Sequence, residues 1–368
     1  MAVGAVLVTM VLFDVFQSIL MPRRSGSILR LAPHLLVFIW PLWRWIGVRL
    51  RPAWRREDFL GTFAPFAIVL LLVAWFATLI VGFGLMLYAL QDQFQPTIVD
   101  YETAFYVAGT SLFTIGFGDI VATAAPARTF VLLSGAAGLT IVGLVIALTF
   151  NLYGSFARRE VLVLVLDSRA GVPPSGVTLL ETYGRAHIID ELATMFLQFE
   201  LWTAEMLDSH LAYPILPYFR SSHDGQSWVS ALGAVLDAAT LLTTAIPEDA
   251  AQHNDLLRKG RAGAEMIYSI GCHAIVDLTH FQIFRHRFTN TSQGPGIERA
   301  EFEAACRQLA DAGYPTQCSE KSWRAFAESR AAYATRLNLL ARYFASPPSQ
   351  WIGDRSVLAH VRADHIHA

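Results

Sequence analysis

Two stretches without any charged residue constrain this chain more than any other feature. Residues 59–90 and residues 129–157 contain no Asp, Glu, Lys or Arg. Each exceeds the ~20 apolar residues that a helix needs to cross the hydrocarbon core of a bilayer. The whole chain is only 16% charged, whereas soluble proteins carry about 25%. Because the apolar excess ends near residue 157, the sequence predicts a membrane part followed by a soluble part.

A third apolar segment, residues 2–20, precedes these two. The basic residues Arg23 and Arg24 follow it, whereas a signal peptide carries its positive charge ahead of the apolar run. We therefore predict a retained membrane helix whose C-terminal end faces the cytoplasm. Asp14 lies within it, and a carboxylate at that depth normally faces protein or water. It is either a membrane-embedded polar site linked to ions or a structural hydrogen-bonding partner of a neighbouring helix.

Within residues 29–52, the segment 35–46 is apolar and rich in Trp, interrupted by Pro41 and Arg44, with arginines on both sides. Arginines at both ends, together with interfacial Trp residues, favour an amphipathic helix that lies on the cytoplasmic membrane surface. The arginines do not recur at every third position, which argues against a voltage-sensor helix. The region 1–58 is thus predicted to hold one membrane helix and one interfacial helix.

Between the two uncharged stretches lies a segment that is too short to cross a membrane. Residues 100–113 begin with Asp100, a suitable N-cap, and Glu102 falls in the first turn. About 10–14 apolar residues suit a re-entrant helix. Non-helical backbone at membrane depth is tolerated only where it lines a cavity or is buried in protein. The segment therefore predicts a short helix that delivers the chain to such a cavity.

The hexapeptide after this helix is Thr114-Ile115-Gly116-Phe117-Gly118-Asp119. A row of carbonyls aimed at one axis needs backbone conformations of alternating hand, and Gly116 and Gly118 adopt φ > 0 at little cost. The side chains of Ile115 and Phe117 would then point away from the axis and pack behind it. The hydroxyl of Thr114 would add a further oxygen.

The hexapeptide, placed between two membrane helices, resembles the selectivity filter of potassium channels, usually Thr-Val-Gly-Tyr-Gly-Asp. The resemblance covers about residues 59–157 and implies that a ring of backbone carbonyls from residues 114–118 coordinates K⁺. It also places Asp119 at the outer mouth. One such loop in each chain implies a closed homotetramer. In the inner helix, Gly138 and Gly143 are hinge candidates, and close helix packing is the alternative role for both.

Residues 158–368 form the predicted soluble part, a cytoplasmic α-helical regulatory domain for a ligand that the sequence does not identify. From Glu160 onward there are 23 acidic and 17 basic residues, a net charge of −6, which does not favour nucleic-acid binding. Residues 160–167 fit either a strand or a continuation of the inner helix. No G-x-G-x-x-G motif follows them, so a dinucleotide-binding domain is not predicted. We hypothesise that this part gates the inner helix through residues 158–167.

Candidate sites for other chemistry are sparse. His273, Asp277 and His280 share one helical face and are a weak candidate for a metal or proton sensor, with an interior histidine pair as the alternative. The three cysteines include no C-x-x-C pair, so neither a zinc site nor a disulfide framework is predicted. No cofactor is expected beyond K⁺ as the permeant ion.

The sequence thus predicts an all-α, pore-loop membrane protein of the cell membrane, in contact with lipid, that conducts K⁺ passively and is not an enzyme. Two alternatives stay open. Phe117 lacks the hydroxyl of the usual Tyr, which favours a less selective cation channel. A membrane-anchored binding or enzymatic domain with a non-conducting pore-like anchor is the other alternative, although no nucleophile–base or metal motif supports it.

Overall fold

The computed structural model describes residues 1–19, 31–223, 225–280, 297–347 and 349–351. Of these described residues, 79% are helical, and the chain divides into two compact units. Unit 1 comprises Met1–Trp43, Thr62–Gly154 and Ala212–Ile215. Unit 2 comprises Arg44–Gly61, Ser155–Leu211 and the chain from Leu216 onward. Each unit is described separately.

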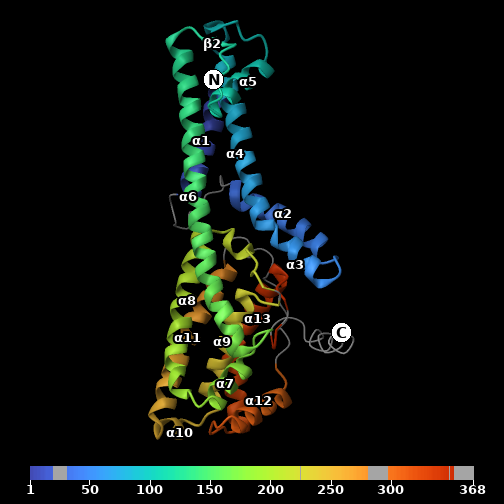
Figure 1. Cartoon of the computed structure of the whole chain (residues 1–368), viewed down its shortest axis with the longest axis vertical. Coiled ribbons are helices and arrows are strands. Elements are labelled where there is room, and N and C mark those ends of the chain that lie inside the picture. The colour runs from blue at the N-terminus through green and yellow to red at the C-terminus, as the bar shows by residue number, and fades with distance from the viewer. Residues whose placement is uncertain (20–30, 224, 281–296, 348, 352–368) are drawn as a thin grey trace. The chain divides into compact units, whose positions relative to one another are not determined.

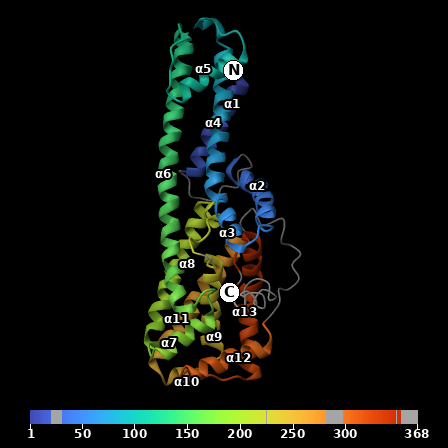
Figure 2. The ribbon, with the colours of Figure 1, turned by 45° about the vertical axis from the view of Figure 1, so that its right-hand side comes forward.

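Unit 1 is built from long apolar helices. They are α1 (Ala2–Ile19), α4 (Phe63–Tyr88) and the first part of α6 (Ala125–Ala170), with the short α5 (Tyr101–Leu112) beside the ends of α4 and α6 (Figures 1 and 2). Three helical stretches, Ala2–Ile19, Ala53–Tyr88 and Ala125–Ala170, are long and apolar enough to cross a membrane. These stretches support the prediction of an all-α membrane protein.

Helix α1 packs along α4 through small and β-branched residues. Val8, Val11 and Val15 are buried, and their spacing of three and four residues places them on one face of α1. A Cβ atom on Gly82 would lie 2.8 Å from Cγ2 of Val8, and one on Gly4 would collide with the carbonyl oxygen of Gly82. The two backbones can approach so closely because both positions lack a side chain, a common basis of helix association in membranes.

Short structures connect α4 to α6 around α5. A 3₁₀ turn (Gln91–Gln93) leads into strand β1 (Phe94–Gln95), which pairs antiparallel with β2 (Val121–Ala122). The carboxylate of Asp100 accepts a hydrogen bond from the backbone N–H of Thr103 at 2.8 Å, so the predicted N-cap of α5 is confirmed. The strand pair closes the segment that contains α5 and residues 113–120.

Helix α6 is longer than the sequence indicated. It begins at Ala125, four residues before the predicted start, and continues without interruption to Ala170. Residues 160–167 are therefore helical, and the alternative of a strand is wrong. Val163, Leu166 and Ala170 are buried, whereas Val161 and Leu164 are exposed. Burial at intervals of three and four residues is the pattern of a helix with one packed face, which overrides the β-propensity of the valines.

Two helical segments near the start of the chain have boundaries that differ from those predicted from the sequence. The uncharged stretch 59–90 is divided between α3 (Ala53–Gly61) and α4, with Thr62 outside both helices. Pro65 lies in the first turn of α4, where a residue without an N–H is tolerated. The interfacial segment forms one helix, α2 (Leu31–Gly47), which includes Pro41.

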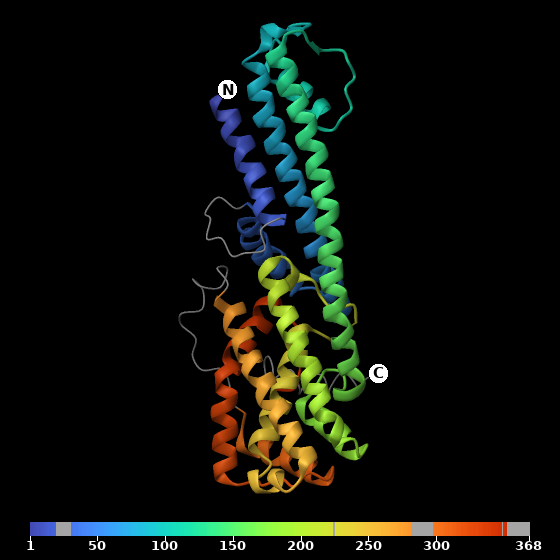
Figure 3. The same cartoon turned by 90° about the vertical axis from the view of Figure 1, so that its left-hand side faces the viewer.

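Unit 2 is a bundle of helices (Figure 3). Besides α3 and the last part of α6, they are α7 (Gly176–Arg185), α8 (Leu192–Ala212), α9 (Trp228–Thr244), α10 (Glu248–Gln252), α11 (Asp255–His280), α12 (Arg299–Asp311) and α13 (Glu320–Phe344). Nearly all of α9 is buried, because α7, α11 and α13 surround it. A helix that is apolar on all sides suits such a central position.

Helices α7 and α8 are separated by a short turn. The Ser175 hydroxyl accepts a hydrogen bond from the Thr178 N–H at 3.2 Å, so Ser175 caps α7. Helix α7 ends at Arg185, and a 3₁₀ turn (Ile189–Glu191) precedes α8. His187 has a φ of +57°, a left-handed conformation that an α-helix cannot contain.

Candidate functional site: the loop between α5 and α6

The loop after α5 starts from the last turn of that helix. The backbone N–H of Thr114 donates to the Ser111 carbonyl at 3.0 Å, and the N–H of Ile115 donates to the Thr110 carbonyl at 2.8 Å. Carbonyls at a helix C-terminus have no partner inside the helix. Here the first residues of the loop supply those partners, and this fixes the direction in which the loop leaves α5.

The loop backbone changes hand repeatedly. Gly116 has a φ of +58° and Gly118 a φ of +77°, the left-handed conformation that the sequence analysis assigned to them. Thr114 also has a positive φ, +55°, which was not expected because a side chain makes this conformation unfavourable. The left-handed residues thus recur at every second position. Such alternation is the requirement stated above for carbonyls that face one axis.

The apolar side chains of the loop are not buried within a single chain. Ile115 is 53% exposed and Phe117 is 68% exposed, although packing behind the loop was expected. The ring of Phe117 lies parallel to that of Tyr106 on α5, with 6.4 Å between the centroids. Exposed neighbouring apolar residues of this kind mark surfaces that associate with another molecule.

Asp119 has a partner that sequence reasoning missed. The hydroxyl of Tyr106 donates a hydrogen bond to Oδ2 of Asp119 at 2.8 Å. The two residues are thirteen positions apart, across the turn from α5 into the loop, so no local spacing rule identifies the pair. The bond ties the end of the loop back to α5.

The two hinge candidates on α6 have different surroundings. A Cβ atom on Gly138 would collide with the backbone carbonyl of Leu112 at the end of α5, and the nearby Ser134 hydroxyl donates to the Ala108 carbonyl at 3.3 Å. Gly138 therefore allows α6 to pack closely against α5. A Cβ atom on Gly143 would meet no atom within 4 Å. The helix continues through both residues.

Asp14, the polar residue of α1, is 1% exposed. It accepts a hydrogen bond from Nε1 of Trp75 on α4, at 2.7 Å to Oδ2. This geometry matches the structural alternative, a hydrogen bond to a neighbouring helix. Trp75 lies 61 residues from Asp14, so no local pattern in the sequence indicates the pair.

The candidate sensor on α11 is loosely arranged. Nε2 of His273 lies 3.8 Å from Oδ2 of Asp277, and the His273 side chain is 66% exposed. His280 is the last residue of the helix. Across the described ranges, no group of three or more His, Cys, Asp or Glu side chains is placed to hold a metal ion.

A buried arginine organises the part of α6 that belongs to unit 2. The guanidinium of Arg159 donates to the Phe219 carbonyl at 2.7 Å and to the Glu160 carboxylate at 3.0 Å. The Arg159 carbonyl accepts from Nε1 of Trp202 on α8 at 3.0 Å. His210 is buried with its Nε2 3.4 Å from the guanidinium. Burial, and secondarily the charge of Arg159, hold the pKa of His210 well below its usual range.

Comparison with known proteins bears on one part of the chain. Residues 68–154 match a family of two-transmembrane ion channels, described as "Ion channel". Neither the curated proteins nor the solved structures include a significant match. The matched residues run from α4 through α5 and the loop into α6. This segment is therefore similar to an ion-channel family domain, which supports passive ion conduction by a membrane protein.

Proposed function

We propose that this protein is a potassium-selective channel in which four copies form one pore. The observation that carries the proposal is the loop 114–119, with left-handed backbone at Gly116 and Gly118, at the end of a helix too short to cross a membrane. The loop lies within the residues that match the ion-channel family.

Conduction is passive in this mechanism. The carbonyls of residues 114–117 and the Thr114 hydroxyl replace the water shell of K⁺, and repulsion between neighbouring ions moves them onward. The C-terminal end of α5 carries partial negative charge, which favours a cation in the cavity. Asp119 and the acidic residues near α5 (Asp92, Asp100 and Glu102) concentrate cations at the outer mouth.

A homotetramer supplies what one chain lacks. One loop provides a quarter of the carbonyl ring, so closure requires a four-fold arrangement of identical chains. The exposed Ile115 and Phe117 would be covered by neighbouring copies. On α6, an apolar exposed stripe includes Leu132, Leu139 and Ile146 and would face the pore or the neighbouring subunits.

We assign unit 2 to the cytoplasm, because Arg158 and Arg159 follow the uncharged stretch 129–157 in the sequence. Residues 158–167 lie inside α6, so a displacement of this segment moves the inner helix directly. The hydrogen bonds of Arg159 to α8 and to residue 219 make it the coupling residue between a bound cytosolic ligand and the pore.

Phe117 favours a second candidate, a less selective cation channel. It lacks the hydroxyl of the usual Tyr and therefore cannot donate a hydrogen bond behind the loop. The Tyr106–Asp119 hydrogen bond supplies a different brace, one residue position away from Gly118. We favour potassium selectivity because this brace restrains the loop.

The test is ion flux from proteoliposomes under equal K⁺ and Na⁺ gradients. We expect K⁺ flux far above Na⁺ flux, lost in Gly116→Ala because a side chain is strained at a φ of +58°. Gly61→Ala is the matched control, since a Cβ atom there meets nothing within 4 Å. Equal K⁺ and Na⁺ flux would favour the second candidate.

If no flux is seen, a measurement of ion binding distinguishes a closed gate from a non-conducting pore. Calorimetric titration of the purified tetramer with K⁺ does not require an open gate. We expect K⁺ binding that Na⁺ does not reproduce and that Gly116→Ala abolishes. A wild-type protein with neither K⁺ flux nor K⁺ binding contradicts the proposed function.

A further inference from the structure

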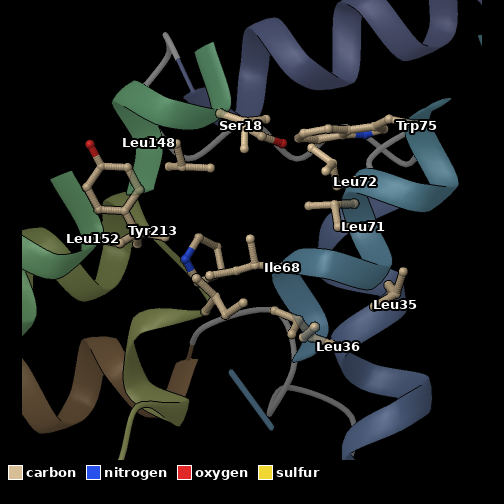
Figure 4. Close-up of a pocket in the computed structure, with 14 residues that line it drawn as sticks. Ser18, Leu35, Leu36, Ile68, Leu71, Leu72, Trp75, Leu148, Leu152 and Tyr213 are labelled. Carbon is tan, nitrogen blue, oxygen red and sulfur yellow. The ribbon is translucent and has the colours of Figure 1, made fainter. Parts of the chain in front are cut away.

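An apolar pocket lies inside unit 1, between α1, α2, α4 and α6 (Figure 4). One side is open, and its enclosed volume of about 60 Å³ exceeds the ~10–15 Å³ that a single water molecule needs. Leu71 and Leu72 of α4 face Leu148 and Leu152 of α6 across this space (Figure 4). These walls offer an occupant almost exclusively carbon atoms.

A polar group lines the pocket on the α1 side. The Ser18 hydroxyl lines it (Figure 4) and is buried without a hydrogen-bonding partner among the described residues. A buried hydroxyl left unbonded is unfavourable, and such groups normally have a partner. Trp75, which forms the adjacent wall, already donates its indole N–H to Asp14. The Ser18 hydroxyl is thus available as a donor to an occupant.

The lining residues belong to one end of the membrane helices. Ile68 to Trp75 lie in the first half of α4, Leu148 and Leu152 lie shortly before Arg158, and Ser18 is next to the end of α1. This is the arginine-rich end of each helix. Helices of this length cross the whole hydrocarbon core. The pocket therefore lies at the depth of the acyl chains of one leaflet.

Helix α2 adds evidence that lipid is present at this end. Phe38, Leu42 and Trp45 are exposed, and their spacing of four and three residues places them on one face. The guanidinium of Arg49 lies 3.7 Å from the centre of the Trp45 ring. Exposed aromatic residues beside an arginine are typical of a helix at the level of the lipid head groups. A neighbouring lipid thus has its head group near α2 and its tail near the pocket.

We propose that the pocket is a binding site for one acyl chain of a membrane glycerophospholipid, whose ester carbonyl accepts a hydrogen bond from the Ser18 hydroxyl. The occupant is apolar because the walls are apolar, and the bilayer supplies such chains at the required depth. An empty space of this kind would forfeit dispersion contacts along its whole lining. The ester carbonyl satisfies the hydroxyl, which a hydrocarbon chain alone does not.

The bound chain would also affect the pore, and this step rests on the proposed function. Because α4 and α6 line opposite walls, a chain between them sets their separation. Gly143 lies one turn before the α6 wall residues, with open space around it. A filled pocket would hold α6 straight beyond Gly143, and an empty one would allow it to move toward α4.

The site is tested with the full-length protein in nanodiscs that contain a phospholipid with a diazirine near the end of one acyl chain. After irradiation, labelled peptides are identified by mass spectrometry. We expect labelling concentrated in residues 68–75 and 145–152. Leu148→Trp fills the pocket and should reduce this labelling at least fivefold. Leu12→Trp, on the exposed face of α1, should leave it unchanged.

A second filling variant, Ile68→Trp, guards against misfolding of the first, and size-exclusion chromatography confirms that each variant is assembled. The site would be overturned if labelling only equalled that of the exposed face of α1 and neither filling variant reduced it. That result would mean annular lipid only. Ion flux, measured with the same variants in proteoliposomes, reports separately on the pore. Lost labelling with unaltered K⁺ flux would overturn the effect on α6 but retain the site, and absence of wild-type flux would bear on the proposed function alone.

Discussion

Asp14 in unit 1 and Asp237 in unit 2 are each 1% exposed, yet their carboxylates have different partners. Oδ2 of Asp14 accepts a hydrogen bond from the neutral indole of Trp75 at 2.7 Å. Oδ1 of Asp237 accepts from Nε of Arg330 at 2.8 Å and from the hydroxyl of Tyr333 at 2.6 Å. Unit 2 therefore places an opposite charge beside its buried carboxylate, and the hydrogen bond in unit 1 comes from a neutral donor.

The difference follows from what each set of helices must do. In unit 2 a buried ion pair lets α9 and α13 meet in one register, at the expense of two desolvated charges. Between membrane helices, polar contacts take the place of the hydrophobic effect, which does not hold helices together within a hydrocarbon layer. The two aspartates thus represent two ways of joining helices through a carboxylate, and they should respond differently when the donor is removed.

The largest effect is expected for Arg330→Leu. The substitution leaves Asp237 buried without the guanidinium of its ion pair. Removing one partner of a buried ion pair destabilises a protein by about 3–5 kcal/mol. We expect the free energy of unfolding of unit 2 to fall by about that amount in chemical denaturation followed by Trp fluorescence. Arg324→Leu on the same helix is the control, since its pair with Glu320 is 77% exposed on the Arg side and such pairs contribute ~0–1 kcal/mol.

The double variant Asp237→Asn/Arg330→Leu sharpens this result. It removes both charges, and the loss should be smaller than in Arg330→Leu because no isolated charge stays buried. A double variant as unstable as the single one would show that Arg330 acts through packing, including its contact with the Trp351 carbonyl, and not through the charge of Asp237.

A smaller effect is expected for Trp75→Phe. The change removes the indole donor of the Asp14 carboxylate, and removing one partner of a buried hydrogen bond costs about 1–3 kcal/mol. Hydrogen exchange of the α1 amides in nanodiscs should accelerate by about 5- to 150-fold, because α1 detaches from α4 more often. Exchange in α13 is the internal control. Unchanged α1 exchange would indicate that the small-residue contact at Gly4 and Gly82 holds α1 without the hydrogen bond.

Features with local signals were predictable from the sequence. The three long apolar segments and the cap Asp100 rest on composition or on residues within one turn. The loop 114–119 was identified for the same reason, since its residue types and order are contiguous. Local signals did not predict helix ends that depend on contacts with other segments. Examples are the division of 59–90 at Thr62 and the extension of α6 beyond Arg158.

The contacts that position the candidate sites are mostly non-local. Tyr106 reaches Asp119 across a turn, Trp75 reaches Asp14 over 61 positions, and Arg159 reaches the Phe219 carbonyl over 60 positions. No spacing rule of helices or strands applies to such pairs. The left-handed conformation of Thr114 was also unpredictable, because Thr has no intrinsic preference for it.

His210 extends the comparison to a buried group that is kept neutral. Its folded-state pKa lies well below that of the unfolded chain, near 6.5, because of burial and the neighbouring Arg159. Below pH ~6.5 the unfolded state therefore binds a proton that the folded state does not bind. Unit 2 should lose up to about 1.4 kcal/mol per pH unit as the pH falls below ~6.5. His210→Gln should flatten this slope of unfolding free energy, and an identical slope in both proteins would contradict the assignment.

Asp14→Asn should have the smallest effect and decides whether Asp14 needs its charge. The amide oxygen of Asn has the same geometry as the carboxylate oxygen and still accepts from the Trp75 indole. Replacing a charged acceptor by a neutral one weakens the bond by a fraction of the ~1.5–3 kcal/mol that hydrogen bonds to charged groups contribute. We therefore expect α1 exchange within about fivefold of wild type and unaltered K⁺ flux. If Asp14→Asn instead abolishes flux while exchange in α1 stays normal, Asp14 is an ion-linked site and the structural role derived from the Trp75 hydrogen bond is insufficient.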